Sequence, residues 1–390
     1  MSGQFPLDRR ALLARTARAG AALPLLSLSL RLADWDVDHP VPVDRRPKVL
    51  SRAMVFAHPT ADPYDPSNHH GFNHAPSVVL LPDGRLLAAW FSGPFEASVN
   101  QVILGSHSSD RGLTWSPAEV LQDFPHKSDF DPAFIADGER TWLFFSAGRW
   151  NRYPFVRDEV NEVGVNSFST YARYSDDSGR VWSPPVAVSP RHGSRSNGIK
   201  LSTGELLLPM EEFDGSQAGV LKSADRGRTW KLLGKITTPA GADEPSMAEL
   251  RSGTIMMILR TTDGYLWKCF SKNKGETWSA PERTNIAAAA SSANLLRLSD
   301  GRLILMHDES PRYRTPLTVR VSRDEGATWD EPFVLAEIAV PSPNDPVWGV
   351  QVTYPSATEL SDGTVVVVWS EIILADAEQY GDIRAARIQV

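Results

Sequence analysis

The sequence has little cysteine, no cluster of basic residues and no long apolar stretch beyond its first residues. Its single cysteine, Cys269, excludes an internal disulfide and a cysteine-based metal cluster, and we expect it to be a small buried strand residue. No run rich in lysine or arginine occurs and the formal net charge is −7, which argues against nucleic acid or an anionic membrane as a partner. After residue 33 no stretch is long and apolar enough for a transmembrane helix. No histidine and aspartate cluster has metal-ligand spacing, so we expect no metal and no cofactor.

Proline, glycine and tryptophan are abundant instead. The chain contains 29 Pro, 27 Gly and 12 Trp, which indicates many turns and a packing position that recurs. The N-terminus has a different character. Residues 8–13 resemble a twin-arginine export signal, with an apolar stretch following at 19–30. We therefore expect an export signal at residues 1–33 and an exported protein, periplasmic or extracellular.

An octapeptide of the form Ser-x-Asp-x-Gly-x-Thr-Trp recurs through the chain. Asp or Asn folds back onto the backbone of a tight turn there, and Gly takes the positive φ that the turn needs. Trp then anchors a hairpin between neighbouring sheets. We interpret the repeat as architecture and not as a binding motif. The five copies have their glycines at Gly112, Gly179, Gly227, Gly275 and Gly326.

A second repeat interleaves with the octapeptides. Apolar strands flank a turn that we expect to be of the two-residue Asp-Gly type. Six such hairpins, five of them followed by an octapeptide, predict six units of four strands, and periods near 50 residues are typical of a propeller. The last unit lacks the octapeptide, and we expect residues 383–390 and a strand near 53–57 to complete it. The turn glycines are Gly84, Gly138, Gly204, Gly253, Gly301 and Gly363.

These repeats give a fold class and a family resemblance. We expect an all-β, six-bladed β-propeller over residues 50–390, joined to the export signal by a linker at 34–49. A propeller with these octapeptides, known as Asp boxes, resembles the sialidase (neuraminidase) superfamily, and the short sequence motifs of its blades are similar to those of the BNR-repeat sialidase-like family. The resemblance implies an exo-acting glycosidase that releases a terminal acidic sugar from glycans.

The resemblance also implies roles for individual residues. Glu244 matches the carboxylate that activates the nucleophile, and Tyr354 matches the nucleophile itself. Arg260 and Arg314 match two arginines of a triad that binds the substrate carboxylate, with Arg312 as a near neighbour of the second. A neutral phenol avoids the repulsion that a carboxylate nucleophile would meet at an anomeric carbon bearing a carboxylate. Arginine suits carboxylate binding because its planar fork matches two oxygens.

The first unit departs from the family pattern. His74 stands where the family has the first arginine of the triad, so we expect it to contact substrate in that arginine's place. The loop carrying the acid/base is not recognisable, and Glu96 is the nearest carboxylate in register for the catalytic acid. His69 and His70 lie just upstream and are alternatives, and His70 is kept as a candidate substrate contact.

Other charged residues are candidates for lining the site. Asp131 begins the inner strand of the second unit and is a candidate substrate contact. Lys200 and Glu211 hold similar positions in the third unit and are candidates of the same kind. Three arginines in loops of the second and third units are candidates to replace the missing triad arginine: Arg149, Arg157 and Arg195.

Three functions fit this pattern. The first is an exported sialidase that uses Tyr354 and Glu244 with retention of configuration. The second keeps the fold and acts on a uronic acid or deoxy sugar, as a glycosidase or as a lyase with His and Tyr as base and acid; the His74 replacement favours it. The third is a non-catalytic glycan-binding propeller. Convergence of Tyr354, Glu244, Arg260 and Arg314 at one mouth of the central channel would argue against the third.

Overall fold

The computed structural model describes residues 46–59, 69–148, 168–340, 349–375 and 378–390. The chain divides into two units, Met1–Asp44 and Arg45–Val390, and every described residue belongs to the second. The predicted export signal and most of the predicted linker lie outside the described residues. Within the described residues, no helix is long and apolar enough to cross a membrane.

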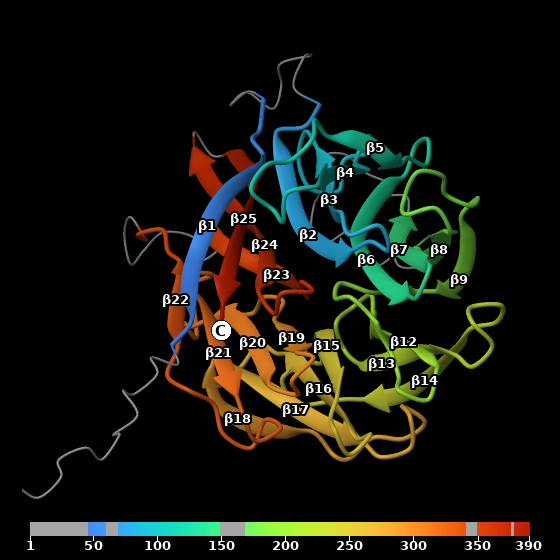
Figure 1. Cartoon of the computed structure of the whole chain (residues 1–390), viewed down its shortest axis with the longest axis vertical. Coiled ribbons are helices and arrows are strands. Elements are labelled where there is room, and N and C mark those ends of the chain that lie inside the picture. Colours follow the sequence, from blue (N-terminus) through green and yellow to red (C-terminus); the bar gives the residue numbers. More distant parts are fainter. Residues whose placement is uncertain (1–45, 60–68, 149–167, 341–348, 376–377) are drawn as a thin grey trace, which may run out of the picture. The chain divides into compact units, whose positions relative to one another are not determined.

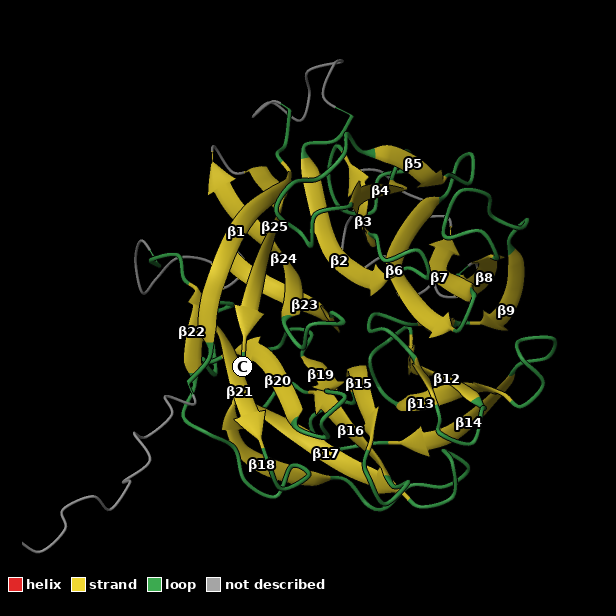
Figure 2. Ribbon diagram, in the orientation of Figure 1, coloured by secondary structure: helices red, strands yellow, loops and turns green. Residues whose placement is uncertain are grey.

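The described part of the chain forms six antiparallel sheets around one centre, a six-bladed β-propeller, as expected (Figure 1, Figure 2). From the axis outward, blade 1 contains β2 (Phe72–Leu80), β3 (Leu86–Gly93), β4 (Val102–Ser108) and β5 (Glu119–Gln122). Blade 2 contains β6 (Ser128–Asp137), β7 (Arg140–Gly148), β8 (Ser169–Ser175) and β9 (Val186–Pro190). Blade 3 begins with two short strands, β10 (His192–Gly193) and β11 (Ile199–Lys200), followed by β12 (Leu206–Glu212), β13 (Ala218–Ser223) and β14 (Lys231–Ile236). Blade 4 contains β15 (Asp243–Glu249), β16 (Ile255–Arg260), β17 (Tyr265–Ser271) and β18 (Glu282–Ala287). Blade 5 contains β19 (Asn294–Arg297), β20 (Leu303–Asp308), β21 (Leu317–Ser322) and β22 (Phe333–Ala336). Blade 6 contains β23 (Val350–Glu359), β24 (Val365–Ala375), β25 (Glu378–Gln389) and β1 (Lys48–Phe56).

The ring closes through the two ends of the propeller sequence. The outermost strand of blade 6 is β1, which pairs antiparallel with β25 from Lys48↔Gln389 to Phe56↔Ile383. This is the closure expected from the strand near 53–57, although β1 begins two residues before the expected boundary at 50. Because β1 pairs with β25, the last strand of the propeller has a partner on both sides.

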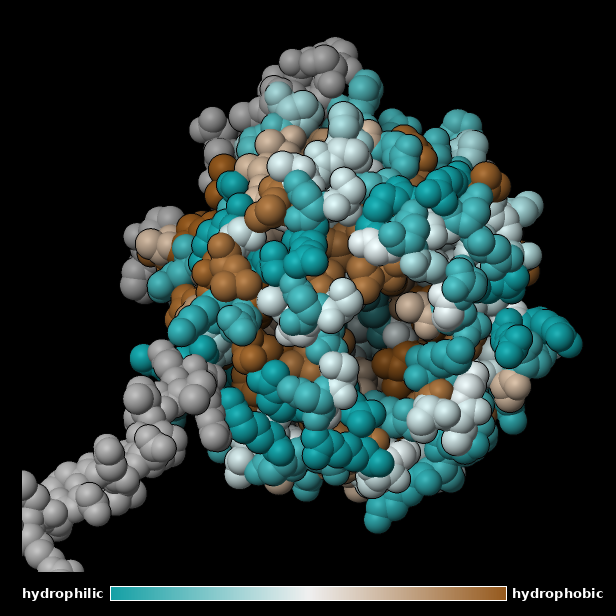
Figure 3. Space-filling model, in the orientation of Figure 1, coloured by the Kyte–Doolittle hydropathy of each residue, from teal (hydrophilic) through white to brown (hydrophobic). Residues whose placement is uncertain are grey.

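Six apolar clusters fill the spaces between neighbouring blades. Each cluster draws most of its side chains from two adjacent sheets, and the one between blades 1 and 2 also includes Tyr354 and Ile372 of blade 6, so every blade buries both of its faces. Cys269 is fully buried in the cluster between blades 3 and 4, which confirms the expectation for it. Burial raises the pKa of its thiol to about 12. Figure 3 shows a mostly hydrophilic surface on one face, with hydrophobic side chains around the central hollow.

The five octapeptides adopt one conformation, as predicted. In the first, the Ser108 hydroxyl accepts from the Gly112 amide at 2.9 Å, and Asp110 accepts from the Thr114 amide at 2.9 Å. All five glycines have φ between 78° and 83°. Each tryptophan packs on the cluster shared with the preceding blade: Trp115, Trp182, Trp230, Trp278 and Trp329.

The Asp-Gly turns differ from the two-residue form expected. In five blades the turn has three residues, as in blade 1, where the Gly84 amide donates to Leu81 O at 2.9 Å and Leu81 N donates to Arg85 O. Gly84 then takes φ 85° as the last residue of the turn. This is a type I turn followed by a residue in the left-handed region. Both this turn and the two-residue turn place glycine at a position of positive φ. The dipeptide alone therefore did not determine the turn length.

Candidate active site

Four inner strands share one distortion that directs side chains to the axis. A residue with positive φ precedes a proline in each, and the strand register shifts around it. A bulge of this kind turns a side chain away from the regular alternation of a strand. The four residues are Ala75 (φ 56°), Asp131 (51°), Glu244 (35°) and Tyr354 (57°). Three of them were candidates from the sequence.

Tyr354, Glu244 and Arg260 form a connected group. The Tyr354 hydroxyl donates to Glu244 Oε1 at 2.6 Å, although the two residues lie 110 positions apart. Arg260 Nη1 donates to the Tyr354 hydroxyl at 3.0 Å and lies 2.7 Å from Glu244 Oε2. The structure therefore brings these three candidates together.

The surroundings fix where the shared proton rests. Burial acts to raise the pKa of Glu244, but the Arg260 charge and the hydrogen bond from Tyr354 lower it below its ordinary value. Burial and the neighbouring carboxylate raise the pKa of Tyr354 above its ordinary value. At neutral pH the phenol therefore keeps its proton, and an ionised Glu244 accepts from it.

Arg314 lies beside this group, whereas Arg312 does not. The Arg314 guanidinium carbon is 5.3 Å from the centre of the Tyr354 ring, and its Nη atoms donate to Gln351 Oε1 and Ala290 O, both at 2.9 Å. Arg312 is exposed and lies over the ring of Tyr313, at 5.1 Å. Of the two neighbouring candidates, only Arg314 is brought to the tyrosine.

His74 lies beside Tyr354 but supplies no charge. Its ring lies 4.2 Å from that of Tyr354, and its Nδ1 lies 3.0 Å from the Ser370 hydroxyl. Burial, followed by the charges of Arg314, Arg195 and Arg260, lowers its pKa well below the ordinary value. A neutral imidazole therefore lies at the position where the family resemblance implies the first arginine of the triad.

The other two histidine candidates have no described contact with this group. His70 Nδ1 lies 2.9 Å from the Ser92 hydroxyl on β3, and burial lowers the pKa of this histidine. His69 is exposed. Neither is placed against Tyr354 or Glu244 by a described hydrogen bond or ring contact.

Two carboxyl groups lie on the blade 1 and blade 2 side of the site. Asp131 is half-buried, and burial raises its pKa to about 7 against the opposing charge of Arg195, with Glu244 and Glu96 adding to the rise. Glu96 is exposed in the loop between β3 and β4, within electrostatic range of Asp131. Both candidates are therefore close enough to influence each other.

Blade 3 contributes Glu211 but not Lys200. Glu211 Oε2 accepts from the Glu244 amide at 2.5 Å, and the Asp243 carboxylate accepts from the same amide at 3.1 Å. Burial and the neighbouring carboxylates raise the pKa of Glu211 well above its ordinary value. Lys200 instead pairs with Asp137 at 2.6 Å, near the turn end of the inner strands. Asp243 was not among the candidates from the sequence. Its position directly before Glu244 was the signal that could have identified it.

Of the three candidates for a replacement arginine, the structure describes Arg195, and its Nη atoms are bound by protein. Arg195 is 1% exposed and donates to the backbone carbonyls of Pro76 and Tyr354 at 3.1 and 3.2 Å. Arg149 and Arg157 lie outside the described residues. Among the residues that the structure describes, no group of His, Cys, Asp and Glu is arranged to hold a metal ion.

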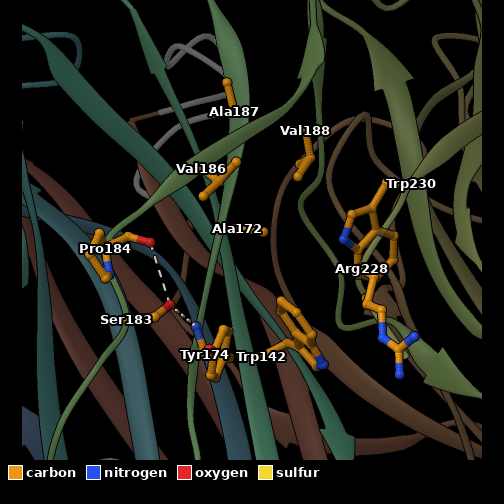
Figure 4. Close-up of a pocket in the computed structure, with 11 residues that line it drawn as sticks. Trp142, Ala172, Tyr174, Ser183, Pro184, Val186, Ala187, Val188, Arg228 and Trp230 are labelled. Atoms are coloured by element: carbon orange, nitrogen blue, oxygen red, sulfur yellow. Dashed lines mark hydrogen bonds between the residues drawn. The ribbon is translucent and has the colours of Figure 1, made fainter. Parts of the chain in front are cut away.

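Two cavities lie away from this group. One of about 490 Å³ lies between the outer parts of blades 2 and 3, where Figure 4 shows the Trp142 and Trp230 side chains facing it. Another of about 500 Å³ is lined by the turn ends of the inner strands, including Lys200, Glu249 and Arg297. No candidate catalytic residue lines either cavity.

Comparison with known proteins agrees with the fold and the repeats. Residues 84–367, more than half of the chain, match the family described as a BNR repeat-like domain. A sialidase of Micromonospora viridifaciens is 26% identical over an alignment of 325 residues that covers 74% of this chain and 48% of the relative. The chain thus spans about half of that relative's length.

Solved structures share the propeller at low identity. The Hadza microbial sialidase Hz136 is 19% identical with a TM-score of 0.68, covering 86% of this chain and 68% of that one. A Dyadobacter fermentans protein of unknown function is 18% identical with a TM-score of 0.67, covering 88% and 99%. The NanB sialidase of Streptococcus pneumoniae is 17% identical with a TM-score of 0.67, covering 87% and 70%. The chain belongs to the sialidase-like BNR repeat family.

Proposed function

We propose that the protein is an exo-acting glycoside hydrolase of sialidase type that releases a terminal acidic sugar from glycans with retention of configuration. The observation that carries this proposal is the hydrogen bond of 2.6 Å from the Tyr354 hydroxyl to Glu244 Oε1, with Arg260 bound to both side chains. A phenol held against an ionised carboxylate is a nucleophile with its base in place. The sialidases among the relatives support the same reaction class.

The proposed steps use residues of this chain only. Tyr354 oxygen attacks the anomeric carbon while its proton passes to Glu244, and the bond to the leaving-group oxygen breaks. Glu96 protonates that oxygen. Water then attacks the anomeric carbon and gives a proton to Glu96, the bond from that carbon to the tyrosine oxygen breaks, and the released oxygen takes its proton back from Glu244. Arg260 and Arg314 bind the carboxylate of the sugar through charge-assisted hydrogen bonds.

The direct test is hydrolysis of a fluorogenic sialoside by the purified full chain beside Tyr354→Phe. Turnover that collapses in the folded mutant would support the proposal. A folded wild-type protein that releases no fluorophore would reject the sialidase assignment. Glu96→Gln should slow substrates with poor leaving groups far more than those with good ones, because only the former need a proton donor.

A second candidate function rests on His74. This ring is neutral, and among the described residues it stands at the position of one of the family's three arginines, which favours a uronic acid or deoxy sugar as substrate. The rings of His74 and Tyr354, 4.2 Å apart, could also act as the base and acid of a polysaccharide lyase. A lyase creates a carbon–carbon double bond, so ultraviolet absorbance during incubation with uronic-acid polysaccharides distinguishes it from a hydrolase.

A non-catalytic glycan-binding role is the third candidate. Against it stands the concentration of buried charge and of left-handed residues at one place, which is costly in a protein that needs only a binding surface. Binding of sialosides without turnover by wild type and Tyr354→Phe alike would favour this role over the first two.

We also propose export through the twin-arginine signal at residues 1–33. Replacing Arg9 and Arg10 together by Lys should keep the protein in the cytoplasm of a host that has this pathway. Equal appearance of mutant and wild type outside the cytoplasm would reject the signal.

A further inference from the structure

Arg195 occupies the blade 3 position that corresponds to the nucleophile and its base. It stands nine residues before its turn glycine, Gly204, just as Glu244 stands nine before Gly253 and Tyr354 nine before Gly363. The inner strand of blade 3 is broken here into β10 and β11, with Arg195 between them. In a ring of six blades, blade 3 lies across the axis from blade 6, which carries Tyr354.

The Arg195 side chain spans that axis. Its Nη2 donates to Pro76 O in blade 1 and to Tyr354 O in blade 6, at 3.1 and 3.2 Å, and its Nη1 lies 3.5 Å from the Ser77 hydroxyl. One guanidinium thus holds the backbone of two bulges from the opposite side of the channel. Both bulges contain a left-handed residue, a conformation that persists only where the surroundings enforce it.

The charge of Arg195 is also directed at the tyrosine. Its guanidinium carbon lies 5.0 Å from the centre of the Tyr354 ring, and it is within electrostatic range of Asp131, Glu244 and Tyr354. The residue is 1% exposed and its Nε has no hydrogen-bond partner. A buried cation with an unsatisfied hydrogen-bond donor lowers the stability of the fold, which indicates a function that retains it.

We propose that Arg195 is a positioning residue for Tyr354. It locks the left-handed backbone at the tyrosine and places a positive charge at the ring, where it favours the negative charge that develops when the phenol gives its proton to Glu244. It does not bind the substrate, because its side chain is enclosed by protein. The inference rests on the proposed nucleophilic role of Tyr354 for its kinetic part only.

The test uses Arg195→Met and Arg195→Lys, with Arg173→Met as the matched control. Arg173 also joins neighbouring blades, because its Nη1 donates to Leu121 O at 2.8 Å, but it has no described contact with Tyr354. Each full-length protein carries ¹³Cζ-labelled tyrosine, and Tyr354→Phe identifies the Tyr354 signal among eight tyrosines. Thermal melting shows which variants are folded.

We expect Arg195→Met to displace or broaden the Tyr354 signal, Arg195→Lys to do so less, and Arg173→Met to leave it unchanged. On a substrate that the enzyme hydrolyses, kcat should fall roughly tenfold to a hundredfold in Arg195→Met with little change in KM. Arg195→Lys should recover part of the loss.

An unchanged Tyr354 signal in a folded Arg195→Met protein would overturn the inference. If that variant does not fold, an Arg195→Lys protein with wild-type signal and wild-type kcat would overturn it equally. Because the spectrum needs no turnover, absence of a hydrolysable substrate would count against the proposed function and would leave the spectral result decisive for Arg195.

Discussion

At the level of single residues, the proposed chemistry depends on one proton between Tyr354 and Glu244. The phenol holds that proton at rest because its own pKa is raised while that of Glu244 is lowered. The two pKa values approach each other only when the phenolic oxygen forms its new bond. Arg260, bound to both partners, stays in place as the charge moves from the carboxylate to the phenolic oxygen.

Removing the base should therefore lower the rate and preserve binding. We expect Glu244→Gln to reduce kcat roughly a hundredfold to ten-thousandfold, the usual contribution of a general base. Steady-state kinetics on the substrate identified for the wild type measures this, with Glu276→Gln on the exposed surface as control. A Glu244→Gln enzyme within threefold of wild-type kcat would contradict the role of Glu244.

The protonation of Asp131 should set the alkaline limit of substrate binding. Its pKa is raised to about 7, so below that pH it is neutral, and above it the carboxylate repels an acidic substrate. We expect KM to rise as the pH increases through about 7. Asp131→Asn is neutral at every pH and should remove this rise; a rise that persists in the mutant would assign it to another group.

At the level of elements, the Asp-box turns fasten each blade to the one before it. Gly227 and Gly253 test this, because both have φ 78° but different surroundings. A Cβ at Gly227 would overlap the Trp142 indole of blade 2, whereas a Cβ at Gly253 would meet no atom within 4 Å.

We expect Gly253→Ala to cost about 1–2 kcal/mol of unfolding free energy, from backbone strain alone. Gly227→Ala should cost about 1–3 kcal/mol more, because the indole must move. Chemical denaturation of both variants measures the difference. Equal destabilisation would mean that the turn of blade 3 does not pack against blade 2 as described.

The elements also show how far sequence could lead. The octapeptides and the hairpin glycines were readable because their hydrogen bonds join residues a few positions apart, such as Asp110 and Thr114. Tyr354, Glu244 and Arg260 were found through family resemblance. The contact of Arg195 with Tyr354 O joins positions 159 apart across the axis, and no local pattern encodes it. The same holds for the bond from the Glu244 amide to Glu211.

At the level of the whole molecule, the buried Asp129 and Asp308 and the half-buried Asp131 predict how the free energy of unfolding responds to pH. Burial raises the pKa of Asp129 to about 8, of Asp131 to about 7 and of Asp308 to about 6. A carboxyl whose pKa is higher in the folded than in the unfolded state stabilises the fold while protonated. The free energy of unfolding should therefore fall as the pH rises from about 4 to about 8.

Asp129→Asn should flatten part of that slope, because the amide does not ionise. Asp225→Asn is the contrasting variant. Its pKa is lowered to about 2 by hydrogen bonds from Thr229, so it contributes stability that is lost only as the pH falls below about 4. Denaturant titrations at several pH values separate the two. A slope above pH 5 unchanged in Asp129→Asn would mean that Asp129 is ionised in the folded protein.

The most direct test of the central claim is to trap the glycosyl-enzyme intermediate. The full-length protein is incubated with a fluorinated acidic-sugar donor whose intermediate hydrolyses slowly, then digested and analysed by mass spectrometry. We predict one added sugar on the peptide that contains Tyr354, absent in Tyr354→Phe. Turnover of a sialoside with the added sugar on a carboxylate residue instead, or with the same adduct in Tyr354→Phe, would contradict the account.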